Sequence, residues 1–293
     1  MLRILLAGAI ASITFGSGSF AADLVPTKAA PYAAPATTWT GWYIGANAGG
    51  VWGTANPNFL IDDRLLYYTF GAGNGANVAR VIGVSNTGVD NSGFTAGGQL
   101  GYNLQLGYWV YGIEADLNYF HPTGSDTRNS TLPPAGGTCT VGGACSPFTV
   151  SYSTSADWLA TLRGRIGMTW NNWLFYATGG LAVAKLNFAA SYADASAPLA
   201  VTSGSLRSNV SGSDTRLGLA IGAGGEYALT ENWSLRAEYL YVRIDGPDLN
   251  TRAVPTVGST GNCNAVTVFC SDFGYSPVFQ EHVARGAINY RFH

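Results

Sequence analysis

Polar and apolar residues alternate along eight stretches of the chain, and this alternation predicts β-strands with one apolar and one polar face. The stretch 282–292 shows the pattern clearly, since small or apolar residues fill every second position and Arg285, Asn289 and Arg291 stand between them. A soluble β-domain would bury the apolar face. A membrane barrel turns that face toward lipid and keeps the polar face in its lumen. Charged residues recur on the polar faces of strands along the chain, and this recurrence favours the membrane barrel.

The predicted strands are separated by connections that alternate between long and short. The strands cover residues 39–53, 92–105, 109–120, 157–170, 173–188, 215–229, 233–242 and 282–292. Membrane barrels have an even number of strands, short periplasmic turns and long external loops. Closure is required because lipid cannot satisfy an exposed sheet edge. The sequence therefore predicts an all-β protein: a closed eight-stranded antiparallel transmembrane β-barrel with long external loops, in the bacterial outer membrane, with both termini periplasmic.

The strand at 173–188 has the least regular pattern. Lys185 and Asn187 on one face indicate that the opposite face meets lipid. The residues assigned to lipid are Leu174, Tyr176, Ala182, Ala184 and Leu186. This assignment leaves three apolar residues inside: Phe175, Leu181 and Val183.

The polar faces carry charges that a barrel lumen must pair or hydrate. The predicted lumen residues are Glu114, Asp116, Arg163, Arg165, Arg216, Glu226, Arg236, Glu238, Arg285 and Arg291, with Lys185 added to the same face. Arginine suits bidentate pairing with carboxylates, and an eight-stranded barrel is just wide enough for its side chains to fill it. We interpret these charges as a structural network that plugs the lumen. The alternative is a charged constriction that passes small solutes.

Composition supports membrane β-structure. Only 11% of the 293 residues are charged, against about 25% in ordinary soluble domains, while 13% are aromatic and 39 are glycine. The net charge is −2 and no basic run occurs, which argues against nucleic acid as a partner.

The N-terminus reads as a secretory signal peptide, residues 1–21. Arg3 precedes an apolar run over 4–15, and small residues precede the expected cleavage point after Ala21. Residues 22–38 are rich in alanine, proline and threonine, and we expect an extended periplasmic leader there. The barrel domain then covers residues 39–293.

Four cysteines remain in the exported chain: Cys139, Cys145, Cys263 and Cys270. Four cysteines allow three pairings. An oxidising compartment and the short spacing within each loop favour disulfides between Cys139 and Cys145 and between Cys263 and Cys270. No CxxC motif occurs and no histidine lies near either pair, so no metal site is predicted.

Motifs of catalysis are absent from the sequence, which contains neither GxSxG nor HExxH. The glycine-rich string at 71–76 lacks the strand–turn–helix context of a dinucleotide site, and the acidic pair Asp62 and Asp63 reads as solvated loop. We therefore expect no enzyme activity and no cofactor. His121 and His282 fall near external strand ends, where they could help to bind a ligand such as haem.

The segments WTGWYIGANAGG, FTAGGQLGYN, LFYATGGLA, GGEYALTENWSLRAEYLY and INYRF together resemble the small outer-membrane β-barrel proteins of Gram-negative bacteria. These are often labelled porin-family or outer-membrane immunogenic proteins and are related in shape to the OmpA transmembrane domain. Tyr290 and Phe292 resemble the terminal signal that the barrel assembly machinery reads, although His293 follows the Phe. The two cysteine pairs are a further departure from the family.

The resemblance implies a structural and surface-interaction role, in envelope integrity and as a surface antigen. The implied partners are outer-membrane lipid, lipopolysaccharide, the barrel assembly machinery and a host surface ligand. Two alternatives remain from the same resemblance: a narrow diffusion channel for small solutes, and binding of haem or another ligand by the external loops. No catalytic residues come with the family.

Overall fold

The computed structural model describes residues 38–61, 75–132, 145–194, 206–255 and 271–292. Its elements are β1 (Gly41–Asn56), β2 (Phe59–Ile61), α2 (Gly75–Ser85), β3 (Val89–Leu106), β4 (Trp109–Leu132), β5 (Ser146–Trp170), β6 (Trp173–Asp194), β7 (Leu206–Ala228), β8 (Trp233–Asp245), β9 (Leu249–Pro255), β10 (Ser271–Tyr275) and β11 (Val278–Arg291). The predicted signal peptide, and the leader up to residue 37, lie outside the described residues. Within the described part of the chain, no helix has the length and apolar character needed to cross a membrane.

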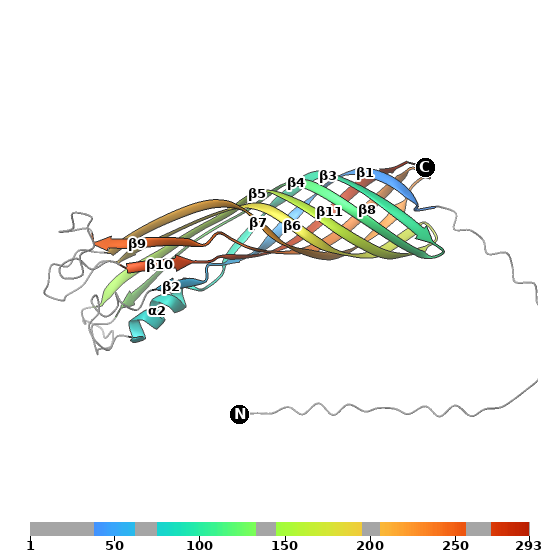
Figure 1. Cartoon of the computed structure of the whole chain (residues 1–293). Helices are drawn as coiled ribbons and strands as arrows, with labels where there is room; N and C mark the ends of the chain where they lie inside the picture. Colours follow the sequence, from blue (N-terminus) through green and yellow to red (C-terminus); the bar gives the residue numbers. More distant parts are fainter. Residues whose placement is uncertain (1–37, 62–74, 133–144, 195–205, 256–270, 293) are drawn as a thin grey trace, which may run out of the picture. The chain divides into compact units, whose positions relative to one another are not determined.

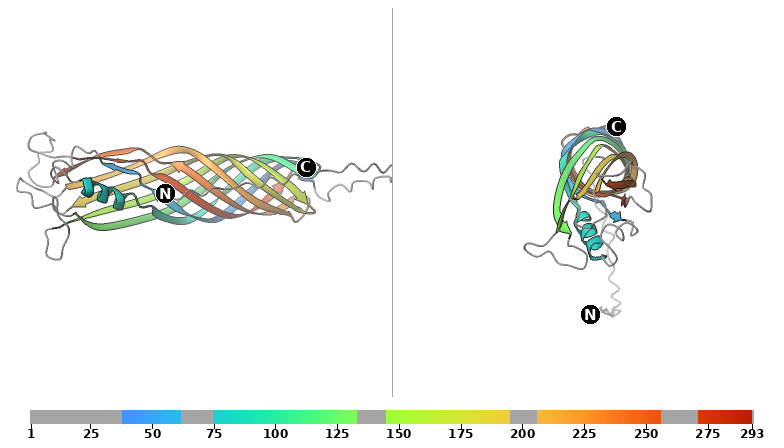
Figure 2. Two further views of the ribbon diagram at one scale, coloured as in Figure 1. Left: turned by 90° about the horizontal axis from the view of Figure 1, so that it is seen from below. Right: turned by 90° about the vertical axis from the view of Figure 1, so that its left-hand side faces the viewer.

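Eight antiparallel strands form a ring in the order β1, β3, β4, β5, β6, β7, β8 and β11, and β11 pairs back to β1 (Figures 1 and 2). The register shows the closure. A path of paired residues runs from Tyr43 through Gly101, Glu114, Arg163, Gly180, Ala220, Val242 and Glu281 and returns to β1 at Gly53. It therefore returns ten residues farther along β1, and this stagger tilts the strands as closed barrels require. The predicted eight-stranded antiparallel barrel is confirmed.

Short turns join the strands at one end of the barrel, which we call the turn end. Gly107 has φ +64° between β3 and β4, and Asn171 has φ 53° between β5 and β6. Glycine and asparagine tolerate this left-handed region better than other residues, which explains why tight turns form at these two places. The opposite end, which carries the long connections, is called the loop end.

The outward face of the barrel is apolar and is bordered by aromatic side chains at both ends. At the turn end, Trp42 packs on Tyr102 and Trp233 packs on Tyr290, with ring centroids 5.3 and 5.1 Å apart. We call this set the turn-end girdle. The loop-end girdle consists of Trp52, Phe94, Tyr119 and Tyr239. Between the girdles lie exposed aliphatic residues such as Leu117, Leu219 and Ile221, each about 60% exposed. Two aromatic belts around an apolar band are typical of a barrel embedded in lipid.

Four strands continue far beyond the loop-end girdle. β4, β5, β6 and β7 have 24, 25, 22 and 23 residues, whereas about 9–11 residues suffice to cross a membrane. The connections predicted after residue 120 and after residue 188 are therefore partly strand. The sequence did not indicate these extensions as strands, because they are rich in serine, threonine and asparagine, which also favour loops.

The strand extensions form a loop-end lobe together with α2, β2, β9 and β10 (Figure 1). One face of the extended sheet packs on these elements through a separate apolar core. Its buried members are Phe59, Val81, Val89, Leu132, Phe148, Val150, Tyr152, Phe188, Ala190, Tyr192, Phe273 and Tyr275. The lobe therefore has its own hydrophobic core, distinct from the interior of the barrel.

Helix α2 was not predicted from the sequence, where Gly83 and several β-branched residues weaken the helical signal. Its Val81, Ile82 and Val84 pack against the lobe core. Arg128 on β4 fastens the C-terminal end of the helix, since its guanidinium donates hydrogen bonds to the carbonyls of Val84, Thr87 and Gly88 at 2.8–3.2 Å. A cationic side chain is favourable at this end of a helix.

The facing predicted for β6 is wrong. Leu174, Ala182, Ala184 and Leu186 are buried inside the barrel together with Tyr176, while Phe175 and Leu181 are 50% and 47% exposed. Lys185 lies on the outward face and pairs with Asp157 at 2.9 Å, both side chains being about 40% exposed. The reason is the length of β6: Lys185 and Asn187 lie near or beyond the loop-end girdle, so polar residues there mark an outward face in water, not a lumen.

Replacing Arg128 should loosen α2 from the lobe without opening the barrel. Arg128→Ala removes three hydrogen bonds from a charged donor, and we expect a loss of about 2–3 kcal/mol in the local opening free energy of residues 79–88. Amide hydrogen exchange would measure it. Arg243→Ala, on the exposed part of β8, is the control and should leave this exchange unchanged. Equal exchange in Arg128→Ala and the wild type would contradict the fastening role.

Candidate functional site: the charged lumen and the loop-end surface

The barrel interior contains a compact network of four arginines and four carboxylates. Its members are Glu114 and Asp116 on β4, Arg163 and Arg165 on β5, Glu226 on β7, Arg236 and Glu238 on β8, and Arg285 on β11. Each is at most 5% exposed. Members that share a strand are two residues apart, so period-two alternation directs them to the same inner face.

Arg163 lies at the centre of the network. Its guanidinium contacts Glu114 at 2.7 Å, Asp116 at 2.7 Å and Glu238 at 3.2 Å. Arg285 contacts two of the same carboxylates, Asp116 at 3.0 Å and Glu238 at 2.6 Å. Two arginines thus share Asp116 and Glu238, and each carboxylate receives donors from two strands.

The remaining pairs extend the network toward the turn end. Arg236 contacts Glu114 at 2.6 Å and Glu226 at 3.4 Å, and Arg165 contacts Glu226 at 3.1 Å. Arg165 also lies over the ring of Tyr176, 4.0 Å from its centroid. Glu114 and Glu226 therefore connect the central pairs with this second group of arginines.

Neutral side chains donate hydrogen bonds to carboxylate oxygens whose hydrogen-bonding capacity the arginines do not fully use. Tyr176 donates to Glu238 at 2.9 Å, Thr161 donates to Asp116 at 2.7 Å, and Asn289 donates to Glu226 at 2.8 Å. Buried charges are tolerated when pairing and hydrogen bonding satisfy them together. This arrangement is that of a rigid polar core.

Glycines opposite the long side chains make room for them. A Cβ atom at Gly101 would collide with the ring of Tyr43, and one at Gly224 would collide with Tyr176. At Gly180 and Gly49 the obstacles are the backbones of Arg163 and Arg285 and their neighbours. The high glycine content thus has a specific use inside this barrel.

Three residues assigned to the lumen from sequence lie apart from the network. Arg216 pairs with Asp214 at 2.9 Å, with both side chains at least one-third exposed. Arg291 is buried at the turn end, where it donates to the carbonyl oxygens of Thr38 and Thr230 and lies 4.3 Å from the Trp39 ring centroid. Lys185 faces outward, as described above. Among the described residues, the network therefore contains equal numbers of positive and negative side chains.

Apolar layers enclose the network on both sides. Toward the turn end lie Trp39, Val110, Leu174 and Ala228. Toward the loop end lies a larger layer formed by Val51, Ala55, Phe120, Ala156, Leu159, Ala182, Ala184, Leu186, Ala220, Leu240, Val242, Ile244, Phe279 and Val283. The interior thus has a charged middle between two mainly apolar layers, which is unlike the polar lumen of a water-filled pore. Each layer also contains a buried charged residue: Arg291 at the turn end, and at the loop end Glu281, which accepts a hydrogen bond from Asn91 at 2.7 Å.

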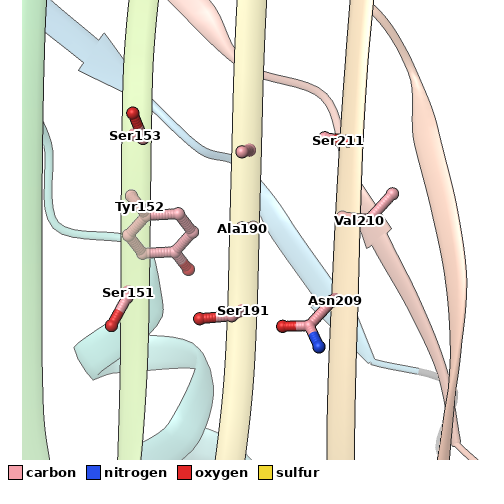
Figure 3. Close-up of a pocket in the computed structure, with 9 residues that line it drawn as sticks. Ser151, Tyr152, Ser153, Ala190, Ser191, Asn209, Val210 and Ser211 are labelled. Atoms are coloured by element: carbon pink, nitrogen blue, oxygen red, sulfur yellow. The ribbon is translucent and has the colours of Figure 1, made fainter.

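The outward face of the lobe has a different chemistry. A shallow furrow of about 340 Å³ runs over β6 between Ser151 and Ser153 of β5 and Asn209 and Ser211 of β7 (Figure 3). A second hollow of about 390 Å³ continues it along the same strands. Most of the lining residues are small or polar, the larger ones are Tyr152, Phe188 and Val210, and none carries a charge. This surface offers neutral hydroxyl and amide groups to a partner.

The other candidate residues form no described site. His121 and His282 lie on β4 and β11, which are not neighbours in the ring, and the Nδ1 atom of His121 is 3.0 Å from the carbonyl oxygen of Ala156. In the described ranges, no group of three or more histidine, cysteine and acidic side chains could hold a metal ion. Asp62, Asp63 and residues 71–74 lie outside the described residues.

The disulfide pairings also remain predictions. Cys145 is disulfide-bonded, but Cys139, Cys263 and Cys270 lie outside the described residues. The structure therefore does not describe the partner of Cys145.

A closed eight-stranded barrel with an apolar outer band, aromatic girdles and inward-facing charges defines a transmembrane β-barrel of the outer-membrane type. Residues 20–256 match the family model of the outer membrane protein beta-barrel domain. The chain belongs to this family and is an outer-membrane protein.

Two curated relatives cover most of the chain. The 31 kDa outer-membrane immunogenic protein of Brucella melitensis is 33% identical over 235 residues, which are 78% of this chain and 82% of the relative. The 22 kDa outer membrane protein of Rhizobium leguminosarum bv. viciae is 27% identical over 259 residues, which are 84% of this chain and 88% of the relative.

Two solved structures align at low similarity. The outer membrane protein OprG of Pseudomonas aeruginosa is 15% identical, with a TM-score of 0.33, over 87% of this chain and 97% of its own. The outer membrane protease OmpT of Escherichia coli is 9% identical, with a TM-score of 0.42, over 86% of this chain and 97% of its own. Similarity at this level carries no argument about activity.

Removing one charge from the network should destabilise the barrel. Glu238→Ala removes one of the two carboxylates that Arg163 and Arg285 share and leaves only Asp116 between them, and we expect the free energy of unfolding to fall by about 3–5 kcal/mol. Denaturant unfolding in lipid vesicles, followed by tryptophan fluorescence, would measure it. The control is Asp214→Ala, which breaks an exposed pair and should cost roughly 1 kcal/mol or less. Similar losses in both variants would show that the buried pairs have no special role.

Proposed function

We propose that this outer-membrane barrel is a non-conducting structural protein that stabilises the cell envelope and presents its loop-end lobe to ligands at the cell surface. We further propose that it has no enzyme activity. The observation that carries the proposal is the charge-balanced network of four arginines and four carboxylates that fills the lumen.

A sealed lumen is favoured over a diffusion channel for two reasons. The network residues are almost completely buried, so their contacts are made to one another and not to a continuous column of water. The apolar layers on both sides would have to separate before a hydrated solute could pass. Such a solute would lose its hydration among alanine, leucine and valine side chains, which is costly.

The proposed orientation places the loop end outside the cell and both chain termini in the periplasm. Outer-membrane barrels keep short turns on the periplasmic side and long connections on the external side. The lobe, with its neutral furrow on β5, β6 and β7, would then stand above the membrane surface. The Brucella relative is named an immunogenic protein, which supports a surface-exposed role for this chain as well.

The barrel assembly machinery is the proposed partner during insertion. The aromatic ring of Phe292 is 50% exposed and packs edge-on against Tyr290, 5.1 Å away, at the turn end. An exposed terminal aromatic pair is accessible for recognition before the barrel closes.

Planar-bilayer recording tests the sealed lumen. The purified wild-type protein should show no steady single-channel openings, under conditions in which a general porin conducts. Glu238→Ala should also stay closed, because the apolar layer at the loop end still fills the bore. Steady openings of the wild type would instead support the diffusion channel. A gain of ion-selective current in Glu238→Ala without any loss of stability would indicate a wet lumen.

The assembly signal can be tested with two exposed phenylalanines. Phe292→Ala should reduce the amount of folded protein in the outer membrane severalfold, because recognition of the terminal strand is weakened. Phe94→Ala removes a similarly exposed ring (56% against 50%) from the loop-end girdle and should have a much smaller effect. Heat-modifiable migration of membrane fractions on gels gives the folded amount. Equal levels in the two variants would exclude a specific role of Phe292.

A further inference from the structure

A shallow pocket of about 390 Å³ lies at the loop-end girdle, on the outward face of β1, β3 and β11. It is separate from the lumen network and from the furrow of the lobe. Its lining includes Trp52, Thr54, Asp90, Gln280 and His282. These residues alternate on their strands and are all on the outward side, where the apolar band ends.

One side of the pocket is an aromatic platform. The rings of Trp52 and His282 stack with an interplanar angle of 18° and centroids 6.0 Å apart. The Tyr239 hydroxyl is 2.5 Å from Nδ1 of His282, which fixes the orientation of the imidazole. The ring of Tyr241 also packs on the imidazole of His282, and the two ring centroids are 5.4 Å apart. The platform is therefore rigid before any ligand binds.

The other side of the pocket is polar. Thr54 is in register with Gln280 on β11 and with Asp90 on β3, and its hydroxyl donates to the Asp90 carboxylate at 3.2 Å. The lining contains one carboxylate and no lysine or arginine. Amide, hydroxyl and carboxylate groups can donate to and accept from several hydroxyls of one ligand.

We propose that this pocket binds a sugar ring in the saccharide headgroup of the lipid of the outer leaflet, lipopolysaccharide. A sugar ring has an apolar face that suits an aromatic platform and a rim of hydroxyls that suits the polar side. An acyl chain would not use Asp90 and Gln280, and a phosphate would be repelled by Asp90 in the absence of a cationic side chain. The position at the edge of the apolar band sets the ligand at the level of the lipid headgroups.

The turn-end girdle offers a comparison within the same molecule. There Trp173 stacks on Phe175 with an interplanar angle of 6°, and Trp233 packs on Tyr290. The loop-end pocket instead combines a tryptophan–histidine stack with Thr54, Asp90 and Gln280. A girdle that only anchors the barrel in lipid does not need this polar side. The inference rests on the proposed orientation, because it requires the loop end to face the saccharide layer.

The test is a binding titration of the full, detergent-purified protein with deacylated lipopolysaccharide oligosaccharide, which has no acyl chains to insert into the micelle. Calorimetry should give a saturable isotherm for the wild type. Trp52→Leu and Gln280→Ala should each weaken binding about tenfold, since each removes one principal contact. The matched control is Trp233→Leu, a girdle tryptophan of equal exposure (44% against 45%) at the turn end, which should bind like the wild type.

Three results of the titration would overturn the proposal. The first is no binding of the oligosaccharide by a wild type that migrates as folded. The second is equal binding by Trp52→Leu, Gln280→Ala and the wild type, and the third is equally tight binding of an unrelated neutral glucan. The Gln280 side chain lies at the edge of the apolar band, so Gln280→Ala should leave the fold intact. A loss of binding in this variant is therefore not explained by misfolding. The titration uses purified protein, so its outcome is independent of bilayer conductance. Protease accessibility of the lobe on intact cells tests the orientation separately, and a lobe inaccessible from outside would overturn both the orientation and this site.

Discussion

The pairing of four arginines with four carboxylates inside the barrel is the interaction on which the rest of the structure depends. Lipid requires the sheet to close, and closure with eight strands encloses an interior just wide enough for its own side chains to fill. Charges placed there must neutralise one another. The network meets this requirement because each carboxylate receives donors from more than one strand, so the ion pairs also tie together strands that are not neighbours in the ring.

This protein differs from a minimal barrel in the length of its strands more than in their number. Four adjacent strands cross the girdle without interruption and supply the foundation of a lobe that has its own apolar core. The same strands therefore meet three environments in succession: the turn end, the lipid band, and water beyond the loop-end girdle. Each environment selects a different outward residue type, from Trp173 through Leu181 to Lys185 on β6 alone.

That succession explains what the sequence could and could not predict. Within the lipid band, alternation identified all eight strands, and it directed Glu114, Arg163 and Glu238 to the inner face. Beyond the girdle the outward face becomes polar, so the polar residue Lys185 marks an outward face there. Arg216 keeps the inward face opposite Ala184, but it lies beyond the network and pairs with Asp214. Residues that pair across the ring depend on the stagger of the strands, which no local pattern encodes. Helix α2 was missed because its packing against the lobe core, not its propensity, stabilises it.

The uninterrupted β5, β6 and β7 also determine how an immune system would perceive this protein. Ser151, Ser191 and Asn209 lie side by side on one face, yet they come from distant parts of the chain (Figure 3). An antibody footprint on this face is discontinuous in sequence, and no linear peptide reproduces it. Because the strands that carry it also close the barrel, such an epitope exists only in the inserted, folded protein.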